Sequence, residues 1–222
     1  DIEIIDQHRD FAVIAVQGPQ SDELLISLGL RVDHEYMSFV TETLAAIAVT
    51  VCRTGYTGER GYELLVPTDE ALAIWDVVVS AGEQFNLRAC GLGARDTLRT
   101  EMGYPLHGND LSAEISPVMA RAAWAVGWSK PEFWGKAALE AQREAKTSRL
   151  LRGIRAVSRG IPRPGMSVFS GDGATIGTVT TGTFSPTLRE GIGLALLDRS
   201  VSVGDRVNVE VRGKLLEFDV VA

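Results

Sequence analysis

The pattern of apolar residues predicts strands alternating with helices over the first two-thirds of the chain. Residues 11–16, 45–53 and 62–66 are apolar or alternating runs of strand length. Residues 21–28 carry leucines at helical spacing, and Gly29 follows as a candidate left-handed cap. Strands and helices in this alternation favour an α+β or α/β layer.

Two more helices are predicted in the same region. Thr68 stands where it can cap one helix, while Gly93 and Gly103 mark the ends of another. The apolar face expected for the first of these helices consists of Leu72, Trp75, Val78 and Val79.

The pattern changes near Arg149, where helical spacing gives way to short β-rich runs separated by glycine-containing turns. These runs are residues 150–157, 166–170, 175–181, 191–197, 206–212 and 215–221. Six strands with no helix between them predict a small barrel or sandwich. We therefore expect an α+β fold, with a mixed sheet and packed helices in residues 1–148 and a small all-β barrel domain in residues 149–222.

Composition excludes several classes of protein. The chain has 222 residues, 45% of them hydrophobic, which is enough for one large or two ordinary cores. Its net charge is -7 and its lysines and arginines are scattered, so we expect no nucleic-acid partner. No apolar run approaches the roughly 20 residues of a membrane helix, and the first residues do not resemble a signal peptide. We expect no membrane partner and a reducing, cytoplasmic setting.

Cysteine and histidine are too sparse and too scattered to suggest a metal site. Cys52 and Cys90 are the only cysteines and lack CxxC spacing, while His8, His34 and His107 lack HxxxH spacing. Because free cysteine is among the most buried residue types, we expect two buried free thiols and no metal.

A glycine-rich turn precedes the strand that carries the most interesting carboxylate. Three glycines between residues 55 and 61 recur at every third position without matching a phosphate-binding motif. A tight turn with glycines at positive φ is the ordinary explanation. On the strand that follows, Glu63 alternates with Tyr62 and Leu64 and so faces the other way. Spacing alone leaves Glu63 as an ordinary exposed glutamate.

Arg95 lies in the first turn of the helix predicted from Gly93. The helix dipole opposes a cation there, so a purely structural Arg95 would need a carboxylate such as Asp96 or Glu101 nearby. For Asp96, Arg99 and Glu101 themselves, ion pairs along the helix are the simpler interpretation.

Two segments, RTGYTGERGYE at residues 53–63 and GLGARDTLRTEMG at residues 91–103, together resemble the T-protein family of the glycine cleavage system. Further similar segments are GYPLHGND at residues 103–110, FWGKAAL at 133–139, GTVTTGTFSP at 177–186 and GIGLAL at 191–196. Many relatives carry Tyr where this chain has His107. The resemblance covers nearly the whole chain.

The resemblance implies half of a tetrahydrofolate pocket. In the family, the glutamate that matches Glu63 recognises the pterin ring, the tyrosine that matches Tyr56 helps line the pocket, and the arginine that matches Arg95 contacts bound folate. The chemistry is suitable. A carboxylate accepts the planar pair of donors on the pterin, and a guanidinium binds an anionic glutamate tail.

The resemblance also implies the reaction and the partner. The family's enzymes take an aminomethyl group from the lipoyl arm of the H-protein, transfer its methylene to tetrahydrofolate and release ammonia. Their catalytic aspartate lies in an N-terminal part of the fold that has no counterpart here. We therefore assign no catalytic residue and expect the isolated chain to be inactive. The expected compartment is the cytoplasm of a bacterium, or the mitochondrial matrix if the source is eukaryotic.

His107 and the tryptophans have more ordinary interpretations. A histidine can shuttle protons near neutrality, but a lone histidine in a glycine-rich turn is more often structural. Trp124, Trp128 and Trp134 are expected to fill an interdomain core.

Three alternatives remain. The folate-dependent helpers of iron-sulfur cluster assembly share the fold but carry a KGCYxGQE motif, where this chain reads RTGYTGE. A folate module of a dimethylglycine or sarcosine oxidising flavoenzyme is the second, although no GxGxxG fingerprint is present. The third is a structural module without a ligand.

Overall fold

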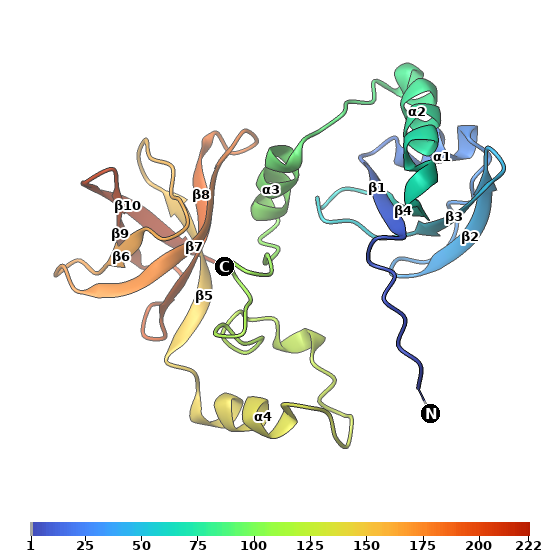
Figure 1. The fold of residues 1–222 in the computed structure, drawn as a ribbon. Coiled ribbons are helices and arrows are strands. Elements are labelled where there is room, and N and C mark those ends of the chain that lie inside the picture. Colours follow the sequence, from blue (N-terminus) through green and yellow to red (C-terminus); the bar gives the residue numbers. More distant parts are fainter. Residues whose placement is uncertain (1) are drawn as a thin grey trace. The chain divides into compact units, whose positions relative to one another are not determined.

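The structure is a computed structural model that describes residues 2–222 (Figure 1). The chain divides into two compact units, Asp1–Arg95 and Asp96–Ala222, which are described in turn. Helix α3 (Leu92–Glu101) contains the division, so its start belongs to the first unit and its remainder to the second.

The first unit is built on a four-stranded sheet. Its strands are β1 (Phe11–Gln17), β2 (Phe39–Leu44), β3 (Ile47–Cys52) and β4 (Gly61–Pro67), in the order β1-β4-β3-β2. The expected class of a sheet with packed helices is confirmed, but every pairing in this sheet is antiparallel where a mixed sheet was expected. Strand β2 escaped prediction because its turn to β3 places Ala45 and Ala46 at positive φ, where glycine or asparagine would have signalled a hairpin.

Helices α1 (Ser21–Ser27) and α2 (Ala71–Gly82) pack on one face of this sheet (Figure 1). Short 3₁₀ turns, Thr68–Glu70 and Glu83–Phe85, flank α2. Gly29 has a φ of 77° directly after α1, which confirms the predicted left-handed cap. The side chains buried between helices and sheet include Ile14, Val16, Leu24, Leu25, Val49, Val51, Tyr62, Leu64, Val66, Ile74 and Val78.

The apolar face predicted for α2 is right for Val78 and wrong for Leu72 and Trp75. Ile74 and Val78, one turn apart, are buried, whereas Leu72 is 72% and Trp75 41% exposed. Alanines complete the buried stripe, and the sequence interpretation gave them too little weight because larger apolar residues occupy the opposite face. Thr68 does not cap α2, since its hydroxyl donates to the carbonyl of Arg9.

The second unit ends in a closed six-stranded antiparallel barrel, which confirms the predicted barrel (Figure 1). The strand order is β10-β5-β8-β7-β6-β9. The strands are β5 (Arg149–Ala156), β6 (Ser167–Phe169), β7 (Thr175–Ser185), β8 (Glu190–Asp198), β9 (Arg206–Val211) and β10 (Lys214–Val221). Inward residues such as Ile154, Ala195, Val209 and Phe218 form its core.

Between α3 and the barrel lie a 3₁₀ turn (Ala123–Ala125) and helix α4 (Lys136–Ala145). The expectation that three tryptophans fill a core here is wrong for two of them, because Trp124 is 86% exposed and Trp134 is fully exposed. Trp128 is half-buried. Its indole N–H donates to the carbonyl of Ala123, and the Arg143 guanidinium lies 4.9 Å from its ring centroid.

Strand β5 begins at Arg149, where the sequence analysis placed the start of the barrel domain. The compact units divide earlier, after Arg95, so residues 96–148 pack with the barrel. The boundary between residues 148 and 149 stays a prediction. Within residues 2–222, none of the helices combines the length and the apolar character needed to cross a membrane.

Candidate functional site

Strand β4 places Glu63 on the face of the sheet that faces away from the helices. Its neighbours Tyr62 and Leu64 are fully buried in the core, while Glu63 is half-buried, as the period of two requires. Opposite Glu63 stand Ala15 of β1 and Cys52 of β3. The predicted direction of Glu63 is confirmed by this register.

The hydroxyl of Thr54 holds the carboxylate of Glu63. Thr54 Oγ1 donates to Glu63 Oε2 over 2.5 Å. The carboxylate also affects its cross-strand neighbour: burial raises the pKa of the Cys52 thiol, and the negative charge of Glu63 raises it further. The site therefore contains a carboxylate with a fixed position and spare acceptor capacity.

The loop between β3 and β4 brings Tyr56 to Arg95. The Arg95 guanidinium lies 4.7 Å from the centroid of the Tyr56 ring, within the range of a cation–π contact. Arg95 is exposed and Tyr56 is half-buried. The same loop supplies Thr54, which bonds Glu63, so a single short segment connects all three residues that the sequence singled out.

Gln17, at the end of β1, holds this loop through side-chain hydrogen bonds. Its Nε2 donates to the carbonyls of Tyr62 and Thr54, and its Oε1 accepts from Thr57 Oγ1. A Cβ added at Gly55 would lie 2.1 Å from Gln17 Oε1, so this glycine allows a close approach rather than a positive φ. Sequence reasoning missed Gln17 because the contact joins residues far apart in the chain.

A second polar cluster lies beside the core. Asp22 Oδ1 accepts hydrogen bonds from Arg60 Nε, at 2.6 Å, and from the Tyr62 hydroxyl, at 2.9 Å. Burial by itself raises the pKa of Asp22, but these two donors outweigh it and leave the pKa below its ordinary value. The cluster anchors the start of α1 to the start of β4.

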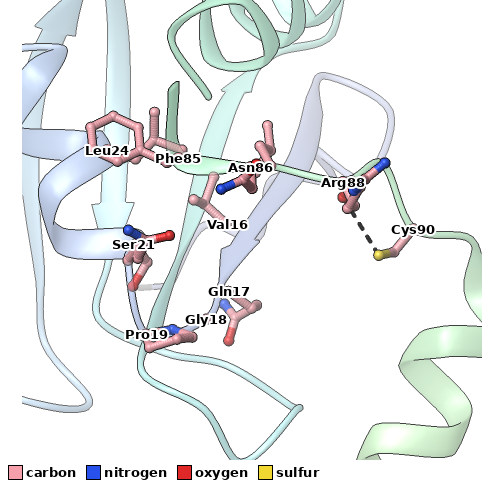
Figure 2. Close-up of a pocket in the computed structure, with 12 residues that line it drawn as sticks. Val16, Gln17, Gly18, Pro19, Ser21, Leu24, Phe85, Asn86, Arg88 and Cys90 are labelled. Carbon is pink, nitrogen blue, oxygen red and sulfur yellow. Dashed lines mark hydrogen bonds between the residues drawn. The ribbon is translucent and has the colours of Figure 1, made fainter. Parts of the chain in front are cut away.

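The first unit also contains a cavity of about 340 Å³ between the end of β1, the start of α1 and residues 85–90 (Figure 2). Figure 2 shows Arg88 and Cys90 at one side, where Cys90 Sγ donates weakly to the Arg88 carbonyl over 3.5 Å. Neither Tyr56, Glu63 nor Arg95 lines this cavity. The predicted site therefore lies outside this cavity.

In the second unit, Arg99 forms hydrogen bonds beyond its own helix as well as within it. It is 1% exposed and donates to Asp96 Oδ1, to Asp110 Oδ2 at 2.8 Å and to Thr181 Oγ1 at 2.9 Å. The pair with Asp96, three residues earlier, was expected.

Glu101, by contrast, accepts from the Ser185 and Thr187 hydroxyls rather than from a cation. His107 is exposed in its turn.

Among residues 2–222, no group of three or more His, Cys, Asp or Glu side chains is arranged to hold a metal ion. Both cysteines are free, but the expectation that both are buried is wrong: Cys52 is half-buried and Cys90 is exposed. Cys90 lies in the irregular segment before α3 and also lines the cavity described above.

Comparison with known proteins finds two family models that match this chain. The model of the GCVT N-terminal domain matches residues 1–130, and the model of the glycine cleavage T-protein C-terminal barrel domain matches residues 149–222. The chain belongs to the glycine cleavage T-protein family.

Named relatives agree with this assignment. The aminomethyltransferase of Frankia alni is 58% identical over 96% of this chain, and that of Mycobacterium bovis is 52% identical over 99%. The crystal structure of glycine cleavage system aminomethyltransferase T from Bartonella henselae matches with a TM-score of 0.86 at 30% identity, over 96% of this chain and 58% of that one. The chain spans 58% and 60% of the two curated relatives, respectively.

Proposed function

We propose that the protein containing this chain is the tetrahydrofolate-dependent aminomethyltransferase of a glycine cleavage system. Family membership and the names of the relatives support the transferase class. The observation that carries the folate assignment is the loop between β3 and β4, which places Tyr56 against Arg95 and Thr54 against Glu63.

The donors and acceptors present at this loop are suitable for tetrahydrofolate. Glu63 is half-buried and accepts a hydrogen bond from Thr54, while a carboxylate offers about four acceptor positions in all. The pterin ring offers an amino group and a ring N–H side by side, a pattern that a carboxylate accepts with two parallel hydrogen bonds. We assign pterin recognition to Glu63.

Tyr56 and Arg95 provide complementary chemistry. The ring of Tyr56 offers an aromatic face for flat apolar surface, and its contact with Arg95 restricts the guanidinium to one side of that ring. A guanidinium also binds carboxylates well, and the tail of folate carries them. We assign folate contacts to both residues.

In the proposed reaction, the protein takes the aminomethyl group carried on the lipoyl arm of an H-protein. Its methylene passes to tetrahydrofolate, ammonia leaves, and the dihydrolipoyl arm is released. Tetrahydrofolate supplies the nitrogen that accepts the one-carbon unit. The residues of this chain act by binding and orientation, which can account for several kcal/mol of a reaction barrier.

The proposal includes a division of roles and a location. An aspartate outside these 222 residues assists proton movement, so the 222-residue chain on its own binds folate weakly and transfers nothing. The partners are the lipoylated H-protein and tetrahydrofolate. We propose the cytoplasm as the compartment in a bacterium and the mitochondrial matrix in a eukaryote.

The test uses the complete protein with an H-protein that carries the aminomethyl-lipoyl group. Release of ammonia should depend on added tetrahydrofolate. In Arg95→Gln the KM for tetrahydrofolate should rise roughly tenfold, the scale of one charge-assisted hydrogen bond. Arg31→Gln, which removes an exposed arginine paired with Glu42, is the matched control. Absence of folate-dependent ammonia release from the wild type would contradict the proposal.

A further inference from the structure

Three arginines of the second unit lie on backbone segments that hydrogen bonds join around the start of β5. Arg152 lies in β5, Arg199 directly follows β8, and Arg121 lies in the loop before the 3₁₀ turn. None of the three forms an ion pair with any residue between 2 and 222. Burial lowers the pKa of Arg152, and the nearby charges of Arg121 and Arg199 lower it further.

Arg152 lies on the inward side of the barrel strand. It stands opposite Ala195 and shares the face of β5 that carries Ile154 and Ala156, all of which are buried in the barrel core. Its Nε is buried and has no hydrogen-bond partner. A buried N–H that gives up water without finding an acceptor is unfavourable, so an anion bound at the half-buried Arg152 side chain would supply an acceptor that the fold does not.

Backbone contacts fix the other two arginines on either side of β5. The amide of Leu151 donates to the Met119 carbonyl over 2.8 Å, which holds the loop of Arg121 against the strand. The amide of Arg199 donates to the Ser148 carbonyl over 2.8 Å. Arg121 has a φ of 58°, a conformation that side chains other than glycine adopt at a cost and that often marks functional sites.

The carboxylate next to Arg199 in sequence already has a partner. Asp198, next to Arg199 in sequence, pairs with Arg149 at 3.3 Å. The cluster is therefore a concentrated positive charge on a chain whose net charge is -7. Such a cluster attracts small anions and raises their local concentration.

We propose that Arg121, Arg152 and Arg199 form a binding site for a phosphate group, carried either by inorganic phosphate or by a small phosphorylated metabolite. Guanidinium groups bind phosphate oxygens in a bidentate manner. A phosphate group carries about -1.5 to -2 charges at pH 7, which matches three uncompensated cations better than a single carboxylate does. The site involves none of the residues assigned to folate, so its test is independent of the test of the proposed function.

Titration calorimetry at low, constant ionic strength tests the site in the complete protein. Inorganic phosphate should give saturable binding to the wild type, and Arg152→Gln should weaken it at least tenfold. Arg199→Gln removes an exposed arginine and should weaken binding severalfold without a risk to folding. The matched control is Arg206→Gln, because Arg206 is a barrel arginine that is already paired with Asp219 and Glu217.

Two further ligands identify the source of the phosphate. Tighter binding of glycerol phosphate than of inorganic phosphate would support a phosphorylated metabolite, and the reverse order would support free phosphate. Acetate should bind much more weakly than either. No saturation by either phosphate ligand, an affinity unchanged in both Arg152→Gln and Arg199→Gln, or equal binding of acetate and phosphate would overturn the proposal.

Discussion

Two arginines in the second unit, Arg99 and Arg152, both have buried guanidinium atoms, but their surroundings are opposite. Arg99 is 1% exposed and is enclosed by acceptors, including two carboxylates and a threonine hydroxyl. Arg152 has a buried Nε with no acceptor, and its charged neighbours are other arginines. One part of the second unit therefore contains a paired polar network, and another part contains a buried donor without an acceptor.

The difference in hydrogen-bond partners indicates different roles for the two arginines. A fully paired buried guanidinium ties α3 and the following loop to β7, and removing one partner leaves the other charge buried and unpaired. An unpaired guanidinium contributes nothing of this kind to the fold, which agrees with the ligand role proposed for Arg152. The predictions below change one side of this comparison at a time.

The largest effect should come from Asp110→Ala. Asp110 is fully buried and accepts from Arg99, Thr181 and the amide of Leu106. Its removal leaves Arg99 with the partly exposed Asp96 as its carboxylate partner and takes away the buried acceptor of Thr181 and of the Leu106 amide, so the free energy of unfolding should fall by about 3 to 5 kcal/mol. Urea unfolding measures this loss.

The control for Asp110→Ala is Asp198→Ala, which breaks the exposed pair with Arg149 and should cost at most about 1 kcal/mol. Equal losses in the two variants would show that the Arg99 network has no special weight in the fold.

Asp22 provides an intermediate case, because it is partly exposed but accepts from both Arg60 and Tyr62. Its pKa is below the ordinary 3.8, so its contribution to stability is complete above that pH and is lost as the pH falls through the folded-state pKa. Asp22→Asn should cost about 1 kcal/mol near neutral pH and progressively less under acid conditions.

Urea midpoints measured between pH 2 and 7 check this dependence. Asp76→Asn, which changes an exposed carboxylate on α2, should leave the shape of the profile intact. A constant difference between wild type and Asp22→Asn at every pH would contradict the role given to the ionised carboxylate.

The smallest effect should come from Arg152→Met. In phosphate-free buffer, replacing an unpaired, partly desolvated guanidinium by an apolar side chain should change the free energy of unfolding by between about 0 and +1 kcal/mol. Chemical denaturation of both forms tests this. A loss greater than 1 kcal/mol would show that Arg152 has a protein partner and would remove the contrast with Arg99.

The extent to which the sequence predicts this molecule depends on how local each signal is. The barrel strands were predicted because each is a short alternating run between turns. Strand β2 was missed because two alanines, rather than glycine or asparagine, form its turn. The exposed positions of Trp124 and Trp134 could not be anticipated, since burial depends on which elements pack nearby and not on residue type.

The candidate sites show the same limit. The direction of Glu63 follows from the period of a strand, but the support of its loop by Gln17 is a contact across 37 positions or more. Helix spacing revealed the pair of Arg99 with Asp96, while the partners Asp110 and Thr181 lie 11 and 82 positions away. The arginine cluster depends on the pairing of β5 with β8 and on the hydrogen bond between Leu151 and Met119, which join positions far apart in the chain.

The central claim is that Glu63 recognises the pterin ring of tetrahydrofolate. Titration calorimetry of the complete protein with tetrahydrofolate should show that Glu63→Gln weakens binding by about 1 to 3 kcal/mol. Glu59→Gln, which changes an exposed carboxylate in the same loop, should bind like the wild type. Equal affinities for wild type and Glu63→Gln would contradict the account.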